Sequence, residues 1–189
     1  GVVFTPVRID TDEVFGAQGP GLDWDAMRRF AAEHRTVWLA RYQESEFQLD
    51  EVGSISTSCG TVRSEPRVRF DGGPEIDTVS VNRIREGVWG VELDWRSSGP
   101  TDGDVFVHVR DSHDNLVVQA DGPALGGMVP IWLWQAGDCI VDKRIVELPA
   151  EGGLYDVLVG VYDSTGRFPA YVDGIRAPDD AASVAAIEP

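Results

Sequence analysis

The stretch WGVELDWR, residues 89–96, decides the fold class of this chain. Its apolar residues Trp89, Val91, Leu93 and Trp95 alternate with glycine and charged residues. Successive side chains of a β-strand point to opposite faces of the sheet, so a period of two indicates a strand with one buried face. We expect this strand to lie in an antiparallel sheet, with both tryptophans in the core.

Strands of the same kind follow toward the C-terminus. Residues 104–110 carry three valines on one face, residues 116–120 return after a polar loop, and residues 155–161 alternate again. Short strands at regular spacing, separated by turns rich in glycine, proline and aspartate, are typical of a β-sandwich. The sequence therefore predicts a mainly β protein, with an antiparallel β-sandwich of the jelly-roll or immunoglobulin-like type over residues 72–189.

The first 71 residues have a different pattern. Residues 2–9 and 36–42 read as strands, and a helix is expected over about residues 23–34, where apolar residues recur at helical spacing. The turn DGGP at residues 71–74 is expected to mark a boundary. We therefore predict a small α/β segment over residues 1–71 (strand, loop, helix, strand), followed by the β-sandwich domain over residues 72–189.

Acidic residues outnumber basic residues by 32 to 16, which gives a formal net charge of −16. Such a surface repels phosphate backbones and anionic headgroups, so the composition argues against nucleic acid as a partner. No apolar run reaches the ~20 residues that a membrane helix needs. The chain opens in a strand-like Val2-Val3-Phe4 without an initiator methionine or a signal peptide, and we expect it to be a piece of a longer protein.

Cys59 and Cys139 are the two cysteines, and neither has a cysteine or histidine at metal-binding spacing. In an oxidising compartment they would form a disulfide. Otherwise they would be two separate buried residues, because a free cysteine behaves as a small apolar side chain. The sequence leaves both alternatives open.

Two groups of motifs resemble a known family. The first group runs through LDWR (93–96), VFVHV (105–109) and QADGP (119–123), and the second through WQAGD (134–138), GLY (153–155) and GVYD (160–163). Together they are similar to the C-terminal β-sandwich of some polytopic bacterial glycosyltransferases. These membrane enzymes use lipid-linked sugars and are related to the protein mannosyltransferases. Residues 30–42 are similar to the α/β unit before that sandwich, whereas Cys139 departs from the pattern, which has a polar or acidic residue there.

The resemblance implies an extracytoplasmic region that is tethered to the membrane in the full-length protein. Its role would be accessory and non-catalytic, either binding a glycan acceptor or docking on the membrane portion of the same polypeptide. The catalytic acidic residues of such enzymes lie in an early loop between membrane helices. No part of this chain matches that loop, so no catalytic residue, metal or cofactor is expected. The alternative is a structural or protein-interaction sandwich of a secreted or cell-surface protein.

Two tryptophans are the aromatic candidates for binding a carbohydrate. Sugar rings present apolar C–H faces that stack on indoles, and Trp132 and Trp134 are expected to share one face beside the glycine-rich loop at residues 125–128. Buried aromatic residues also dominate the packing of sandwiches, so a place in the core is the alternative for both.

Polar candidates lie at the ends of the predicted strands. Gln119, Asp121 and Arg167 are expected to gather at one rim, together with Asp142 and Asp163. Such groups would either contact sugar hydroxyls or form a structural network that holds the loops in place, and the structural network is the expectation that we favour.

The remaining motifs do not indicate a catalytic or metal-binding site. The DTD of residues 10–12 matches a metal-binding motif of nucleotide-sugar transferases, but the chain has no room for the nucleotide-binding domain that it requires. The loop at residues 111–115 lacks the spacing of a calcium loop, and its neighbouring Ser, His and Asp cannot converge as a triad. His108 is expected to be a hydrogen-bonded structural residue. No pair of carboxylates has a sequence context that indicates a glycoside hydrolase.

Overall fold

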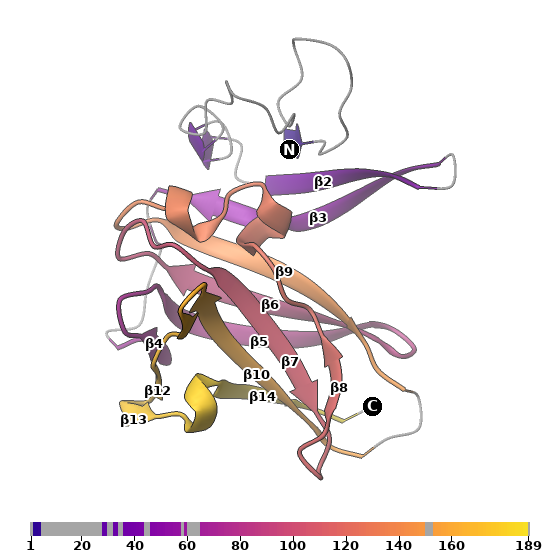
Figure 1. Cartoon of the computed structure of the whole chain (residues 1–189). Helices are drawn as coiled ribbons and strands as arrows, with labels where there is room; N and C mark the ends of the chain where they lie inside the picture. Colours follow the sequence, from indigo (N-terminus) through magenta and orange to yellow (C-terminus); the bar gives the residue numbers. More distant parts are fainter. Residues whose placement is uncertain are drawn as a thin grey trace.

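The computed structural model describes residues 2–4, 28–29, 32–33, 36–43, 46–57, 59, 65–149 and 153–188 (Figure 1). Their strands form two sheets that enclose a common apolar core. This arrangement confirms the predicted mainly β class and the antiparallel β-sandwich. Within these described ranges, three short turns of 3₁₀ helix accompany the strands, namely η1 (Ala124–Gly127), η2 (Ile131–Leu133) and η3 (Pro178–Asp180).

The two sheets differ in size. The larger one has nine strands in the order β1 (Val2–Phe4), β2 (Thr36–Gln43), β3 (Glu46–Ser56), β9 (Cys139–Glu147), β6 (Val88–Arg96), β5 (Glu75–Arg85), β4 (Val68–Phe70), β12 (Ala170–Val172) and β13 (Ile175–Arg176). The five-stranded sheet has the order β11 (Gly166–Arg167), β10 (Tyr155–Asp163), β7 (Asp104–Arg110) and β8 (Leu116–Gln119), with β14 (Ala182–Ile187) also paired to β10. Strands β1 and β2 pair in parallel, and the other neighbouring strands pair antiparallel.

The alternation in residues 89–96 builds the centre of the sandwich. Strand β6 presents Val91, Leu93 and Trp95 to the interior, where each is at most 1% exposed, and Trp89 packs partly buried against the same core. The valines of β7 and β10 face them from the other sheet and are also buried. Full burial of a valine or leucine side chain contributes roughly 1.5–3 kcal/mol relative to exposure. The period-two pattern therefore marks the face that stabilises the fold.

An aromatic row crosses this core. The ring centroid of Trp95 lies 5.9 Å from that of Phe70 on β4 and 6.0 Å from that of Trp134, which follows η2. Tilted ring pairs at these separations add to the gain from burial. The row thus joins β4 and β6 of the larger sheet to the segment between β8 and β9.

Only part of the predicted N-terminal α/β segment lies within the described residues. The strand predicted at residues 36–42 is confirmed as β2, and β1 accounts for the first three residues of the strand predicted at 2–9. Residues 28–29 and 32–33 of the predicted helix have helical backbone. The remainder of that helix, the glycine-rich loop before it and the DTD motif of residues 10–12 lie outside the described residues.

The turn at residues 71–74, predicted as a boundary, lies inside the larger sheet. It connects β4 to β5, which pair antiparallel, and the Gly73 N–H donates to the carbonyl of Phe70 at 3.0 Å. Strand β3 pairs with β9, and Val52, Ile55 and Val68 lie in the same core as β6. A glycine–proline turn signals a reversal of the chain, and a reversal within a sheet has the same sequence signature as a linker between domains.

Candidate functional site

The two candidate tryptophans do not share a face. Trp134 is 0% exposed, and its indole N–H donates to the Val129 carbonyl at 2.9 Å, so it presents no ring face to a ligand. Trp132 lies in the 3₁₀ turn η2 and is 41% exposed. A 3₁₀ helix turns by a third of a revolution per residue, which separates side chains that a strand would align. The expectation of a shared face is wrong, and Trp134 belongs to the core.

The polar candidates lie on the outer face of the five-stranded sheet, which is the face turned away from the core. Gln119 on β8 lies directly opposite His108 on β7 in the strand register. His108 Nε2 lies 3.0 Å from a carboxylate oxygen of Asp121, and the other oxygen accepts the Val107 N–H at 3.2 Å. The side chain of Asp121 is 25% exposed and that of His108 is 12% exposed. Gln119, His108 and Asp121 thus form one polar group, which we call the β7–β8 polar face.

Arg167 lies on the same sheet face, beyond an aromatic cluster. Its guanidinium carbon is 4.5 Å from the centroid of the Phe106 ring, and its Nη1 donates to the Asp179 carbonyl at 3.0 Å. The Phe106 ring in turn lies 4.7 Å from the His108 ring, centroid to centroid. The structure therefore brings three of the predicted residues, Gln119, Asp121 and Arg167, to one face of one sheet.

Gly160 makes room for this cluster. A Cβ at that position would lie 2.1 Å from two ring carbons of Phe106, so the phenyl ring occupies the place of a side chain on β10. Phe106 is consequently 2% exposed, although it points away from the sandwich core, and it forms a small second cluster with Leu158 and Ala181. An outward phenylalanine opposite a glycine in the next strand was the sequence signal for this cluster.

Tyr162 borders the same cluster, with its ring centroid 6.4 Å from that of Phe106. Burial raises the pKa of its phenol, and the negative charges of Asp104 and Asp121 raise it further. The phenol therefore stays protonated as a hydrogen-bond donor over the physiological range.

Asp142 belongs to a different group, inside the sandwich. It is 0% exposed, and its carboxylate accepts the Leu125 N–H at 2.9 Å and two hydrogen bonds from Arg144 at 2.9 and 2.8 Å. Arg144 also donates to the carbonyls of Ala120, Gly122 and Pro123 at 3.1–3.3 Å. These contacts fasten the segment between β8 and η1 onto β9. Of the residues for which a structural network was expected, Asp142 lies in one, and its partner Arg144 is a residue that the sequence did not single out.

Two aspartates organise hairpin loops. The side-chain amide of Asn115 and the backbone N–H groups of Asn115 and His113 donate to the Asp111 carboxylate, which lowers the pKa of that carboxyl. Asp163 accepts bonds from the hydroxyl and backbone of Thr165, which lower its pKa in the same way. Each carboxylate accepts hydrogen bonds from the turn in which it lies, which is common for aspartate in turns. Asp163 therefore does not join the polar groups around Asp121.

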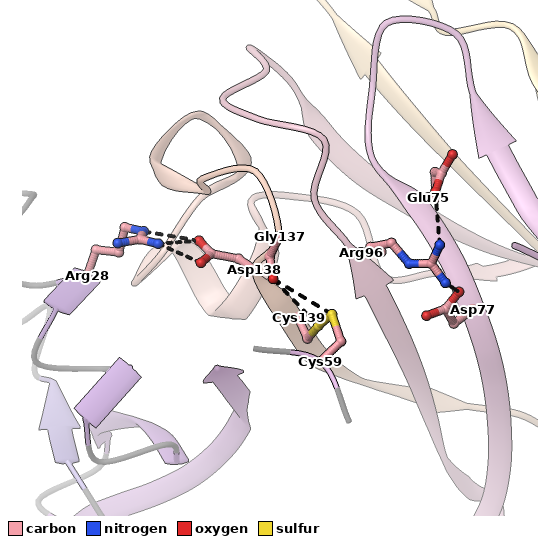
Figure 2. Close-up of a disulfide and its surroundings, with 8 residues drawn as sticks. All are labelled: Arg28, Cys59, Glu75, Asp77, Arg96, Gly137, Asp138 and Cys139. Carbon is pink, nitrogen blue, oxygen red and sulfur yellow. Dashed lines mark hydrogen bonds and ion pairs between the residues drawn. A yellow bond between two sulfur atoms is a disulfide. The ribbon is translucent and has the colours of Figure 1, made fainter. Parts of the chain in front are cut away.

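A disulfide and an ion pair lie side by side where β9 begins (Figure 2). Cys59 and Cys139 are bonded across a sequence separation of 80 residues, with their Cα atoms 5.4 Å apart, which is the usual spacing. The Gly137 carbonyl oxygen lies 3.7 and 3.9 Å from the two sulfurs. The disulfide resolves the alternative that the sequence left open.

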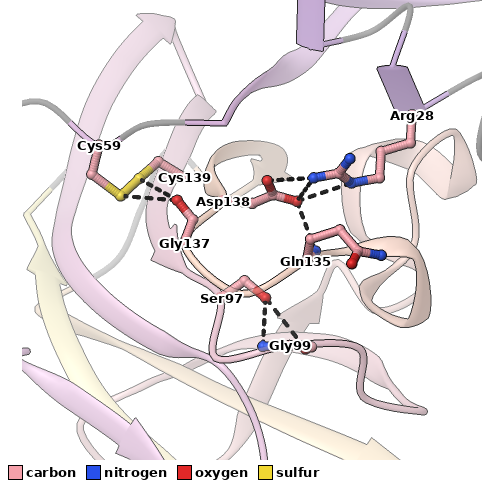
Figure 3. A network of polar contacts seen from close by, with 8 residues as sticks. All are labelled: Arg28, Cys59, Ser97, Gly99, Gln135, Gly137, Asp138 and Cys139. Carbon is pink, nitrogen blue, oxygen red and sulfur yellow. Dashed lines mark hydrogen bonds and ion pairs between the residues drawn. A yellow bond between two sulfur atoms is a disulfide. The ribbon is translucent and has the colours of Figure 1, made fainter.

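The residue before this cysteine holds the ion pair. Asp138 is 2% exposed and accepts hydrogen bonds from Arg28 Nε at 3.1 Å and Nη2 at 2.5 and 2.6 Å, with a further bond from the Gln135 N–H at 2.7 Å (Figure 3). Its backbone carbonyl accepts the Ser97 N–H at 2.9 Å. Residues 138 and 139 thus connect β9 to Arg28, to Cys59 and to the end of β6.

A second ion-pair group lies on β5 and β6. Arg96 Nη2 lies 2.6 Å from a carboxylate oxygen of Asp77, and Nη1 lies 3.8 Å from Glu75 (Figure 2). Among the described residues, no group of three or more histidine, cysteine, aspartate or glutamate side chains is arranged to hold a metal ion. None of the helical stretches that the structure describes is long and apolar enough to cross a membrane.

No protein-family model matches the chain, and no curated protein is significantly similar to it.

Proposed function

We infer that this chain is a non-catalytic accessory β-sandwich that binds a glycan on the β7–β8 polar face. The observation that carries this proposal is the convergence of Gln119, His108 and Asp121 on one open sheet face. An amide, an imidazole and a carboxylate supply donors and acceptors of the kind that match pairs of sugar hydroxyls. Arg167 and Tyr162 lie along the same face and extend the polar row.

The disulfide supports an extracytoplasmic location for this domain. Disulfides persist in oxidising compartments and are rare in the reducing cytosol. The resemblance to the C-terminal sandwich of polytopic glycosyltransferases leads to the same compartment. It also suggests that the domain is tethered to a membrane portion of the same polypeptide, which would carry the chemistry.

The proposal is tested by screening the chain on a glycan array and measuring the affinity of each hit by calorimetry. We expect the Gln119→Ala and Asp121→Asn variants to lose at least about tenfold in affinity, since the first removes the side-chain amide and the second removes the negative charge and one acceptor oxygen. Glu86→Gln is the matched control, because Glu86 is exposed in the turn between β5 and β6 of the other sheet. The proposal of glycan binding at this face would be overturned by an array without hits. It would also be overturned by hits that bind both variants with the same affinity as the unchanged chain.

A second function, that of a protein-interaction sandwich, is favoured by a specific observation. Ile175 on β13 is 76% exposed and borders an apolar groove. Exposed apolar surface of this kind often marks a contact with another molecule.

A further inference from the structure

A groove crosses the outer face of the five-stranded sheet and runs from Asp114, in the loop between β7 and β8, over β10 to β13 and η3. Its volume is about 550 Å³, within the usual range for a binding cleft. Apolar residues of β10, β12 and β13, of η3 and of the positions that flank η3 line it, among them Leu158 and Ala181, which are 8% and 6% exposed. In Figure 1, η3 and β13 lie beside β14 at the yellow end of the chain.

The rim of the groove carries the most exposed of the large apolar side chains that the structure describes. Ile175 is 76% exposed, and Pro178 of η3 lines the same groove. Removing such a side chain from water is favourable. An aliphatic ligand would therefore gain from covering Ile175 together with the apolar floor.

The charges around the groove are unbalanced. Its two arginines are already paired, because Arg110 lies 2.8 Å from Asp114 and Arg176 lies 3.1 Å from Asp180. The lining also contains Asp156, Asp173 and Asp179, and no arginine or lysine of the described residues lies within ion-pair distance of these three carboxylates. The groove is thus apolar at its floor and acidic at its rim.

We propose that this groove binds a segment of a partner protein in which aliphatic side chains are flanked by arginine or lysine. The aliphatic part would cover Ile175 and Leu158. The cations would meet the carboxylates of Asp173 and Asp179 and that of Asp156, which lies across from Arg110 in the strand register and accepts the Ser183 hydroxyl. The net charge of −16 also attracts a cationic partner during encounter. This interaction goes beyond glycan binding and does not depend on it.

A second copy of the chain is the competing occupant. The end of β5 reads Arg83-Ile84-Arg85, with Ile84 58% exposed, so the molecule itself presents a segment of the right pattern. Two copies each carrying −16 repel one another, however, which favours a separate basic partner.

The test uses the chain labelled with ¹⁵N and three short peptide probes observed by NMR. The probes are acetyl-Arg-Ile-Leu-Arg-amide, its acidic counterpart acetyl-Glu-Ile-Leu-Glu-amide, and acetyl-Arg-Gly-Ser-Arg-amide without the aliphatic residues. We expect the first probe to shift the amide signals of Leu158, Ile175 and Ala181 saturably. The other two probes should bind at least about tenfold more weakly, since each lacks one of the two interactions.

Two variants separate the interactions on the protein side. The combined substitution Asp156→Asn, Asp173→Asn and Asp179→Asn removes the charges, and asparagine tolerates the positive φ of 48° and 52° at residues 173 and 179. Ile175→Ser removes apolar surface from a side chain that folding leaves exposed. A matched control changes three exposed acids outside the groove, Glu86→Gln, Asp102→Asn and Glu188→Gln.

We expect the two groove variants to weaken the basic aliphatic probe about tenfold and the control to leave its affinity unchanged. Equal binding of the acidic probe, saturable shifts that map elsewhere, or no saturable shift up to the solubility limit would overturn the proposal. Shifts of the groove signals that depend on protein concentration alone, and vanish in Arg83→Glu/Arg85→Glu, would assign the groove to a second copy and overturn it as well.

Discussion

Arg144 donates two hydrogen bonds to a single carboxylate oxygen of Asp142 inside the sandwich, at 2.9 and 2.8 Å, and donates its remaining ones to three backbone carbonyls. The two residues stand two apart on β9, so both point to the interior. Arg144 thus balances the charge of the buried Asp142 carboxylate, and it also supplies hydrogen bonds to the backbone carbonyls of the loop between β8 and η1.

Removing one partner of this pair should be costly. We expect Arg144→Met to lower the free energy of unfolding by about 3–5 kcal/mol, because the carboxylate of Asp142 stays buried without its cation. Urea unfolding followed by tryptophan fluorescence measures the change. Arg85→Met is the control, since its partner Glu147 is 3.9 Å away and both side chains are more than 70% exposed. Equal stability of the two variants would contradict this account of Asp142.

Reduction of the disulfide should destabilise the domain without changing its topology. Closing a loop of 80 residues contributes roughly 4.5 kcal/mol in the chain-entropy description. We expect the urea midpoint to fall on addition of dithiothreitol, and the Cys59→Ser/Cys139→Ser variant to show the reduced midpoint with or without it. A variant that still responds to the reductant would place the effect elsewhere in the chain.

The outward cluster predicts a pairwise effect between β7 and β10. Gly160→Ala should destabilise the domain by about 1–3 kcal/mol, because the new methyl group would clash with the Phe106 ring. Phe106→Leu in the same chain should relieve part of this penalty. A double-mutant cycle in urea measures the coupling, and strictly additive effects would mean that Phe106 does not occupy the space above Gly160.

The two loop aspartates predict a pH dependence with a definite sign. Their carboxyl pKa values lie below the ordinary value of 3.8 in the folded state, so their stabilising contribution is present above that value and is lost as the pH falls through the lowered pKa. Carboxyl ¹³C chemical shifts during an acid titration measure both values. Asn115→Ala should bring the pKa of Asp111 back toward 3.8 and leave that of Asp163 unchanged.

The sequence predicted the strands with clear alternation and the sandwich that they build. It failed at residues 131–134, where two tryptophans two apart suggested a shared face. A 3₁₀ turn after Pro130 breaks the period there, and local spacing carries no sign of this turn. It also treated a reversal of the chain at residues 71–74 as a boundary, because the pairing of β3 with β9 depends on contacts across more than 80 residues.

The sequence identified the polar residues at the strand ends, but it did not predict which of them come together in the structure. The register between β7 and β8 decides that His108 lies opposite Gln119, and the loop fastened by Arg144 decides where Asp121 lies. Both depend on tertiary packing. The acidic groove was missed because its residues come from β10, β13 and η3, whose proximity no single stretch of sequence reveals.

Formation of the disulfide between Cys59 and Cys139 reports on a late step in the folding of the protein. Cys139 lies opposite Ser56 in the pairing of β3 with β9, and Cys59 follows three residues after Ser56. The two thiols, 80 residues apart in the sequence, therefore come together when β3 pairs with β9. Such distant pairings form late and slowly. Thiol alkylation of samples taken at intervals during oxidative refolding would therefore report when the larger sheet closes, without any substitution in the chain.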